Sequence, residues 1–191
     1  MHINISEEKL ISYIEETLSS STKSIIVAID GRCASGKSTL GKKLAVHFDA
    51  NLFHADDYFL RPEQRTEERL NTPGGNFDIE RFTEEIIKGI KSENDFFYTP
   101  FDCKSMTLAD KASVRKNRIN IVEGSYCCHP QISKSYDIKI FVTTDKKTQT
   151  ERIKLRNKDV AEMFFLKWIP LEEKYFSFFD IENNSDFIIN T

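Results

Sequence analysis

The sequence lacks the features that mark membrane, secreted and metal-stapled proteins. Its longest unbroken apolar run, Ile25–Ile29, is far too short to cross a bilayer, and the first ten residues show no basic-then-apolar signal pattern. Only four cysteines occur, and none belongs to a C-x-x-C pair, so neither a zinc site nor a disulfide framework is indicated. We therefore expect reduced thiols in a cytoplasmic protein.

An excess of basic charge is also absent. The 27 Lys and Arg residues face 30 Asp and Glu residues, and the net charge of −3 argues against a general nucleic-acid binder. No internal repeat or low-complexity tract divides the chain. A length of 191 residues with 39% hydrophobic residues suits one globular domain over residues 1–191, with no membrane partner.

Short apolar runs alternate with amphipathic stretches along the chain. Strands are predicted at Ile25–Asp30, Asn51–Ala55, Ile119–Glu123, Asp137–Val142 and Asp186–Asn190. Helices are predicted at Ser6–Leu18, Lys37 to about His47, Glu80–Lys91, Lys146–Lys158 and on both sides of Pro170 within Val160–Phe179, whereas Leu60–Phe77 is expected to be a long loop or partial helix. This alternation predicts an α/β fold with a parallel sheet covered by helices on both faces.

The segment Gly31–Ser38 carries the most specific motif, G-x-x-x-x-G-K-[ST], between a predicted strand and a predicted helix. Its glycines let backbone N–H groups point inward, and the helix that follows adds its positive end to this anion site. Lys37 is expected to bridge the β- and γ-phosphates, and the Ser38 hydroxyl to bind Mg²⁺. The full set expected to hold ATP is Gly31, Ala34, Ser35, Gly36, Lys37, Ser38 and Thr39.

Two acidic residues follow predicted strands. Asp56, in the pair with Asp57, could accept the proton of a hydroxyl that attacks the γ-phosphate, or the pair could cap a loop. Glu123 could hold Mg²⁺ through water, or cap the next turn. Because the carboxyl ends of parallel strands border the ligand crevice, we favour the functional interpretation of both.

Arginines recur at four-residue spacing in two places. Arg152 and Arg156 share a helix face and could neutralise a transferring phosphoryl group, the alternative being a solvated basic face. Arg61, Arg65 and Arg69 are expected at the surface, with contact to substrate as the alternative.

The chain resembles the uridine kinase family, within the group that includes phosphoribulokinase and bacterial pantothenate kinase. The motifs that carry the resemblance, in order, are "GRCASGKST", "DDYF", "PGGNFDIERF", "TPFDCKSMT", "VEGSY" and "ERIKLRN". The resemblance implies a P-loop kinase with a short helical lid, ATP and Mg²⁺. It further implies that Asp56 is the base, Glu123 the magnesium-side acid and Arg156 a lid arginine. Phe59, Asp78 and Phe101 would lie on the acceptor side.

Three departures from the family pattern concern the acceptor. Met106 stands where uridine kinases typically carry a base-contacting histidine, Phe101 lacks a phenolic hydroxyl, and "NKDVAEMFF" replaces the short arginine- and glycine-rich stretch after the lid arginines. A uridine- or cytidine-like nucleoside is the leading acceptor. Pantothenate, a ribosyl compound or a sugar are alternatives.

The sequence as a whole predicts an ATP-dependent phosphotransferase that acts on a hydroxyl of a small molecule. A nucleotide-binding regulatory protein is the rival from another class. Against it, no N-K-x-D motif for reading guanine occurs, and the aromatics beside Asp56 suggest an acceptor pocket.

Overall fold

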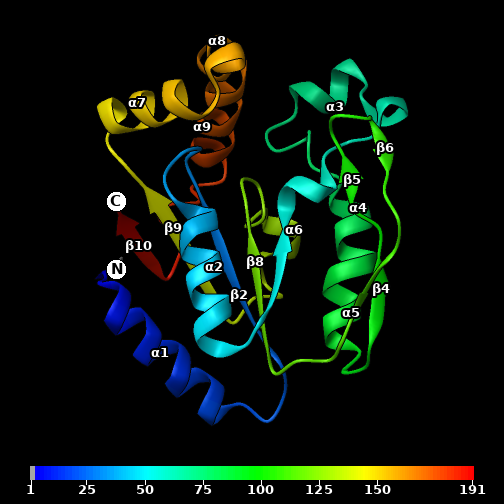
Figure 1. Ribbon diagram of the computed structural model, residues 1–191, viewed down its shortest axis with the longest axis vertical. Helices are drawn as coiled ribbons and strands as arrows, with labels where there is room; N and C mark the ends of the chain where they lie inside the picture. Colours follow the sequence, from blue (N-terminus) through cyan, green and yellow to red (C-terminus); the bar gives the residue numbers. More distant parts are fainter. Residues whose placement is uncertain (1–2) are drawn as a thin grey trace.

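A six-stranded, all-parallel sheet forms the centre of the computed structural model, which describes residues 3–191 (Figure 1). The strand order is β1-β10-β9-β2-β8-β3. The strands are β1 (Ile3–Asn4), β2 (Ile25–Gly31), β3 (Asn51–His54), β8 (Ile119–Glu123), β9 (Ile138–Thr143) and β10 (Phe187–Asn190). The predicted α/β fold and parallel sheet are confirmed, and β1 is an additional edge strand.

Helices cover both faces of the sheet (Figure 1). The helical segments are α1 (Glu7–Ser20), α2 (Lys37–Phe48), η1 (Ala55–Tyr58), η2 (Pro62–Gln64), α3 (Glu67–Asn71), α4 (Ile79–Phe82), η3 (Thr83–Ile87), α5 (Lys88–Lys91), α6 (Pro130–Ser133), α7 (Lys146–Arg156), η4 (Lys158–Val160), α8 (Ala161–Met163), η5 (Phe164–Trp168) and α9 (Ile169–Phe178). Among residues 3–191, no helix combines the length and the hydrophobicity that crossing a bilayer requires.

Two hydrophobic cores lie on opposite faces of the sheet, because central strands of a parallel sheet are buried on both sides. On one face, Leu10 and Ile14 of α1 and Leu44 of α2 pack on alternate residues of β2, β8 and β9. On the other face, the core includes Phe82 and Ile86 from the α4–η3–α5 segment, with Tyr175 and Phe176 from α9. Every residue of β2 is buried, which explains its unbroken apolar run.

Two small antiparallel sheets were not predicted from the sequence. One pairs β4 (Phe96–Tyr98) with β7 (Ala112–Val114), and the other pairs β5 (Phe101–Asp102) with β6 (Thr107–Leu108). These strands are two or three residues long, so they leave no clear alternation in the sequence. The β5–β6 hairpin lies beside α3 at the same end of the molecule (Figure 1).

The segment Lys146–Trp168 forms a short helical lid that continues into α9. Pro170 lies in the first turn of α9, where a missing N–H costs nothing, and the π-helical turn η5 precedes it. Tyr175 and Phe176 of α9 are buried, whereas Met163 and Trp168 on the lid are exposed.

Replacing Gly31 with alanine is expected to lower the free energy of unfolding by about 3 kcal/mol or more. Gly31 has φ +137°, and a Cβ there would lie 2.0 Å from the backbone oxygen of Val142 in the neighbouring strand. Gly36→Ala is the matched control: its φ is +98°, but its Cβ would meet nothing closer than 3.8 Å. Urea unfolding of both variants measures the difference, and equal losses would contradict the close approach of β2 and β9.

Candidate active site

The loop between β2 and α2 is shaped to bind an anion. Ala34 and Gly36 both adopt positive φ, which curls the backbone, and α2 begins directly afterwards at Lys37, so its first N–H groups have no intrahelical acceptor. The Ser35 hydroxyl is buried without a hydrogen-bond partner among the described residues. Lys37 is 8% exposed, and its Nζ donates to the carbonyls of Gly31 at 2.7 Å and Arg32 at 2.9 Å. These donors fit the phosphates of a nucleotide.

Ser38 and Glu123 lie together beside this loop. The Ser38 Oγ donates to Glu123 Oε2 at 3.1 Å, and Glu123 ends β8 with only 4% of its surface exposed. A hydroxyl and a carboxylate are oxygen ligands of the type that Mg²⁺ prefers, so this pair fits the ion.

His54 contacts Glu123, and the sequence did not single it out for this place. Its Nδ1 lies 2.5 Å from Glu123 Oε1, because the last residues of β3 and β8 pair in register. This hydrogen bond raises the pKa of His54. The sequence could have indicated this contact, because His54 and Glu123 both lie at the carboxyl ends of predicted parallel strands.

Asp56 and Asp57 lie on η1, directly after β3. Asp56 is exposed, and desolvation by the atoms around it raises its pKa. The positive charge of Lys37 opposes this rise, while Glu123 and Glu172 add to it. Asp56 is thus electrostatically coupled to both the phosphate-binding lysine and the proposed magnesium-side acid. Asp57 is half-buried.

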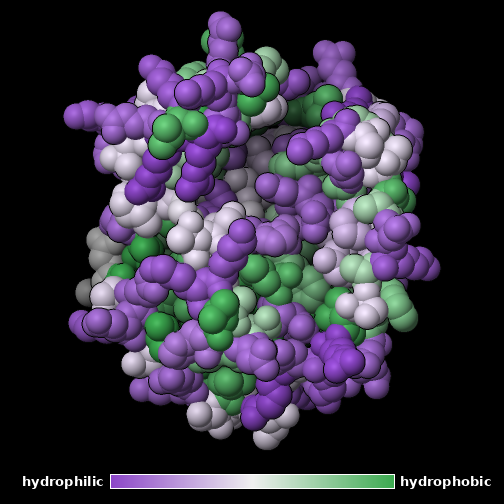
Figure 2. Space-filling view, viewed as in Figure 1, coloured by the Kyte–Doolittle hydropathy of each residue, from purple (hydrophilic) through white to green (hydrophobic). Residues whose placement is uncertain are grey.

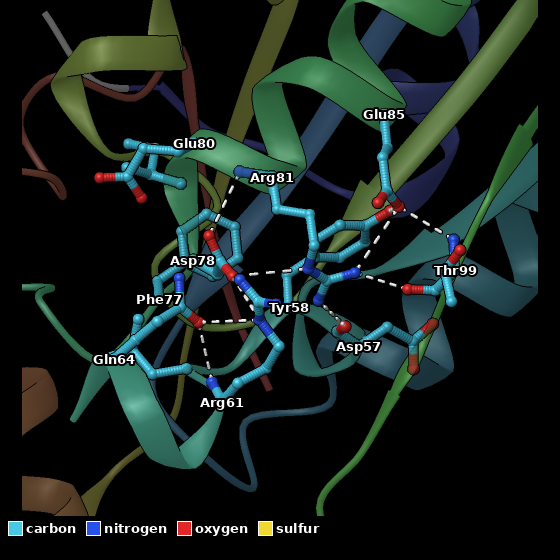
Figure 3. A network of polar contacts seen from close by, with 12 residues as sticks. Asp57, Tyr58, Arg61, Gln64, Phe77, Asp78, Glu80, Arg81, Glu85 and Thr99 are labelled. Atoms are coloured by element: carbon cyan, nitrogen blue, oxygen red, sulfur yellow. Dashed lines mark hydrogen bonds and ion pairs between the residues drawn. The ribbon is translucent and has the colours of Figure 1, made fainter. Parts of the chain in front are cut away.

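An arginine that the sequence did not indicate holds η1 in place (Figure 3). The Arg81 guanidinium stacks 4.1 Å from the centroid of the Tyr58 ring, and its Nη2 donates to the backbone oxygen of Asp57 at 2.7 Å. Its Nη1 donates to the backbone oxygen of Thr99. Glu85 completes the network, because its Oε2 accepts from the Tyr58 hydroxyl and the Thr99 N–H, both at 2.9 Å. These contacts tie η1 to the α4–η3 segment and to the chain leading into β5.

The residues expected on the acceptor side line one end of this network. Asp78 is 1% exposed and caps α4. Its Oδ2 accepts no hydrogen bond from residues 3–191, but it lies 3.4 Å from Arg81 Nε and 3.9 Å from Arg61 Nε. Phe59 is half-buried and pairs with Phe77 through an isolated bridge. Phe101 is 3% exposed at the start of β5.

The two lid arginines differ in position. Arg152 is half-buried, and its Nη1 donates to the Ala34 carbonyl at 3.2 Å and to Thr191 Oγ1 at 2.9 Å, which brings it to the phosphate-binding loop. Arg156 is exposed at the end of α7, and no hydrogen bond or ion pair joins it to another of the residues 3–191. Figure 2 shows a hollow between the lobe of α7, α8 and α9 and the lobe that carries α3, with hydrophilic residues around it.

A buried carboxylate, also missed from the sequence, supports the loop from below. Asp30 Oδ1 accepts from Gly31 N at 2.7 Å and Tyr126 N at 3.2 Å, and Oδ2 accepts from Cys128 N and the Tyr175 hydroxyl, both at 2.9 Å. Full burial raises the pKa of Asp30 to about 6, against the stabilising effect of these donors.

Helix α9 also contacts the loop directly. Glu172 is 7% exposed and accepts from Cys33 N at 2.9 Å and from the Ser125 hydroxyl at 2.7 Å, while Glu173 pairs with Arg32 at 2.7 Å. Burial and the nearby Glu172 charge raise the pKa of Cys33 to about 12, so the thiol stays protonated at neutral pH and is a poor nucleophile.

Comparison with known proteins identifies the fold. No model of a protein family matches the chain, and no curated protein matches it. Among solved structures, it is similar to a possible uridine kinase from Bacillus stearothermophilus, with 17% identity, 95% and 98% of the two chains covered and a TM-score of 0.70. It is also similar to a candidate fructose transport system kinase from Silicibacter sp. TM1040, with 21% identity, 97% and 99% coverage and a TM-score of 0.75.

A third similar structure is D-glycerate 3-kinase from Cryptococcus neoformans var. grubii, with 13% identity, 87% of each chain covered and a TM-score of 0.58. The chain has the P-loop kinase fold. The expectation drawn from the uridine kinase resemblance is confirmed at the level of the fold.

We expect stability to depend on pH through Asp30. In the unfolded chain Asp30 titrates near its ordinary 3.8, and in the folded protein at about 6, so between these values the folded state binds more protons. Its contribution to stability is therefore greatest at low pH, and on the order of 3 kcal/mol is lost as the pH rises through about 6.

Asp30→Asn removes this titration while keeping the shape of the side chain. The unfolding free energy of the wild type, minus that of the variant, should fall as the pH is raised from about 4 to 7. Urea unfolding of both proteins across this range measures it. A difference that stays flat with pH would contradict the raised pKa.

Proposed function

We propose that the protein transfers the γ-phosphoryl group of ATP to a hydroxyl of a small molecule. The observation that supports this proposal is the position of Asp56 on η1, directly after β3, where the charge of Lys37 acts on its carboxylate. A carboxylate at this position could accept the proton of an attacking alcohol, which is the task of the catalytic aspartate in kinases.

Each residue then has a defined task. The loop N–H groups and Lys37 bind the phosphates, and Asp56 orients the acceptor hydroxyl and takes its proton. Arg152, which already reaches the loop through Ala34, compensates charge on the transferring group, and Arg156 joins it when the lid carries it inward. Ser38 and Glu123 would hold Mg²⁺, which when bound neutralises charge on the phosphate oxygens.

The raised pKa of Asp56 has a kinetic consequence. A general base with a pKa above that of an ordinary aspartate is a stronger base, at the cost of being protonated at a higher pH. The positive charge of Lys37 opposes this rise of the pKa.

The acceptor proposed from the sequence is a nucleoside resembling uridine or cytidine. Asp78 supports an acceptor with hydroxyl groups, because its buried Oδ2 forms ion pairs with Arg81 and Arg61 but accepts no hydrogen bond from the described residues. The alternative acceptors, which are pantothenate, a ribosyl compound or a sugar, also carry hydroxyl groups.

Asp56→Asn tests the proposal. It keeps the size of the side chain but cannot take a proton, so the acceptor-dependent kcat should fall at least about a hundredfold, with nucleotide affinity nearly unchanged. Steady-state kinetics and calorimetric titration with nucleotide measure the two quantities.

Asp57→Asn is the matched control. The contact from Arg81 is to the backbone oxygen of Asp57, so the substitution leaves that contact in place and should cost less activity. Full acceptor phosphorylation by Asp56→Asn, or a larger loss in Asp57→Asn, would show that the base is assigned to the wrong residue.

A further inference from the structure

We propose that the acceptor carries an anionic group, a carboxylate or a phosphate, and that Arg65 binds it. This inference rests on the proposed kinase function and narrows its substrate class. It places the reacting hydroxyl at Asp56 and the anionic group at the opposite end of the acceptor, near the β5–β6 hairpin.

Arg65 differs from the two arginines that share its four-residue spacing. Arg61 lies 3.3 Å from Glu63 and 3.9 Å from Asp78, and Arg69 pairs with Glu80 at 2.5 Å. Arg65 forms no ion pair with any carboxylate of residues 3–191; its Nε donates to the Leu60 carbonyl at 2.9 Å. That bond anchors the guanidinium at one edge and leaves the charge of an exposed side chain available to a ligand.

The free end of Arg65 points toward the tip of the β5–β6 hairpin. Its Nη2 lies 3.9 Å from the Met106 sulfur, and Met106 adopts a left-handed φ of 58° at that tip. The hairpin fixes this conformation through a hydrogen bond from Met106 N to the Asp102 carbonyl at 2.8 Å. A thioether offers no donor to a neutral polar ligand, so beside Met106 the group that can donate hydrogen bonds is the guanidinium.

Arg65 and Asp56 both neighbour the β5–β6 hairpin, because Arg65 contacts Met106 at its tip and β5 lies against η1, which carries Asp56. Cys103, also at the hairpin tip, feels both charges: Asp56 raises the pKa of its thiol and Arg65 lowers it, with burial as the largest influence raising it. The Asp102 carboxylate at this tip accepts from Lys104 N at 2.8 Å and the Ser105 hydroxyl at 2.9 Å and forms no ion pair with Arg65. The acceptor space is therefore negative at the Asp56 end and positive at the Arg65 end.

This polarity orients an acceptor with a hydroxyl at one end and an anionic group at the other. A planar guanidinium binds a carboxylate or a phosphate through two parallel hydrogen bonds, which adds geometric specificity to the attraction. Of the acceptors considered above, pantothenate carries such a group and an unmodified nucleoside does not.

Matched acceptor pairs test the inference. We would measure kcat/KM with ATP for glycerol and D-glycerate, panthenol and pantothenate, and ribose and ribose 5-phosphate, with uridine alongside. At least one anionic member should exceed its neutral partner by about tenfold or more, and the carboxylate and phosphate pairs distinguish the two groups. Only the anionic members should lose affinity as the ionic strength rises.

Arg65→Gln should remove the preference by raising KM for the anionic member about tenfold to a hundredfold, with kcat and the neutral member little changed. Arg65→Lys keeps the charge but loses the two-pronged geometry, and should restore part of the preference. Arg115→Gln is the control: this exposed arginine lies next to Asn51, at the opposite end of the strands, and should behave as wild type.

Calorimetric binding of the same pairs, with a non-hydrolysable ATP analogue present, separates this inference from the proposed function. Neutral and anionic members that are phosphorylated equally, in wild type and Arg65→Gln alike, would overturn the inference and leave the kinase intact. Arg65-dependent binding of an anionic member without phosphorylation would support the inference and reject the kinase. Absence of any Arg65-dependent preference in both turnover and binding would overturn the inference.

Discussion

The buried carboxylate of Asp30 is the interaction on which the rest of the site depends. It accepts hydrogen bonds from Gly31, the first glycine of the loop, and from Tyr175 of α9. It also accepts from the backbone N–H groups of Tyr126 and Cys128, which follow β8. Three segments far apart in the sequence are thereby held at one point directly beneath the loop. Burying this group is costly, as its raised pKa indicates, and four donors offset part of that cost.

Electrostatics then divides the crevice into functional regions. Lys37 and the loop N–H groups supply positive charge, and Asp56, Glu123 and Glu172 supply negative charge beside them. Desolvation is the main cause of the raised pKa of Asp56, and the charges of Glu123 and Glu172 add to it. Arg81 holds the backbone of η1 from the far side, so the position of the proposed base depends on the acceptor side of the molecule. Helix α9 continues from the lid and contacts the loop through Glu172 and Glu173.

The sequence predicted those parts of the structure that have local causes. The loop with the G-x-x-x-x-G-K-[ST] motif is encoded in eight consecutive residues, and the central strands in short, mostly apolar runs. The presence of this loop between a strand and a helix, and of the central strands, is confirmed. Asp56 and Glu123 could be nominated because a residue that ends a parallel strand borders the crevice.

The remaining features depend on long-range contacts that no local pattern encodes. Arg81, Tyr58 and Glu85 meet only when α4 packs against η1, and Glu172 reaches Cys33 from 139 positions away. The two hairpins are too short to show an alternating pattern, and the exposure of Trp168 on the lid depends on where the lid lies rather than on its composition.

The most direct test of the central claim is the acceptor dependence of ATP consumption by the intact protein. ADP release would be followed with Mg²⁺ and ATP alone, and then with each member of a panel of neutral and anionic alcohols. A small-molecule kinase should release ADP slowly without an acceptor and much faster with at least one of the alcohols. It should also form one phosphorylated acceptor for each ADP. A rate that no acceptor changes, with ATP still bound and slowly hydrolysed, would contradict the account and favour a nucleotide-binding regulatory protein.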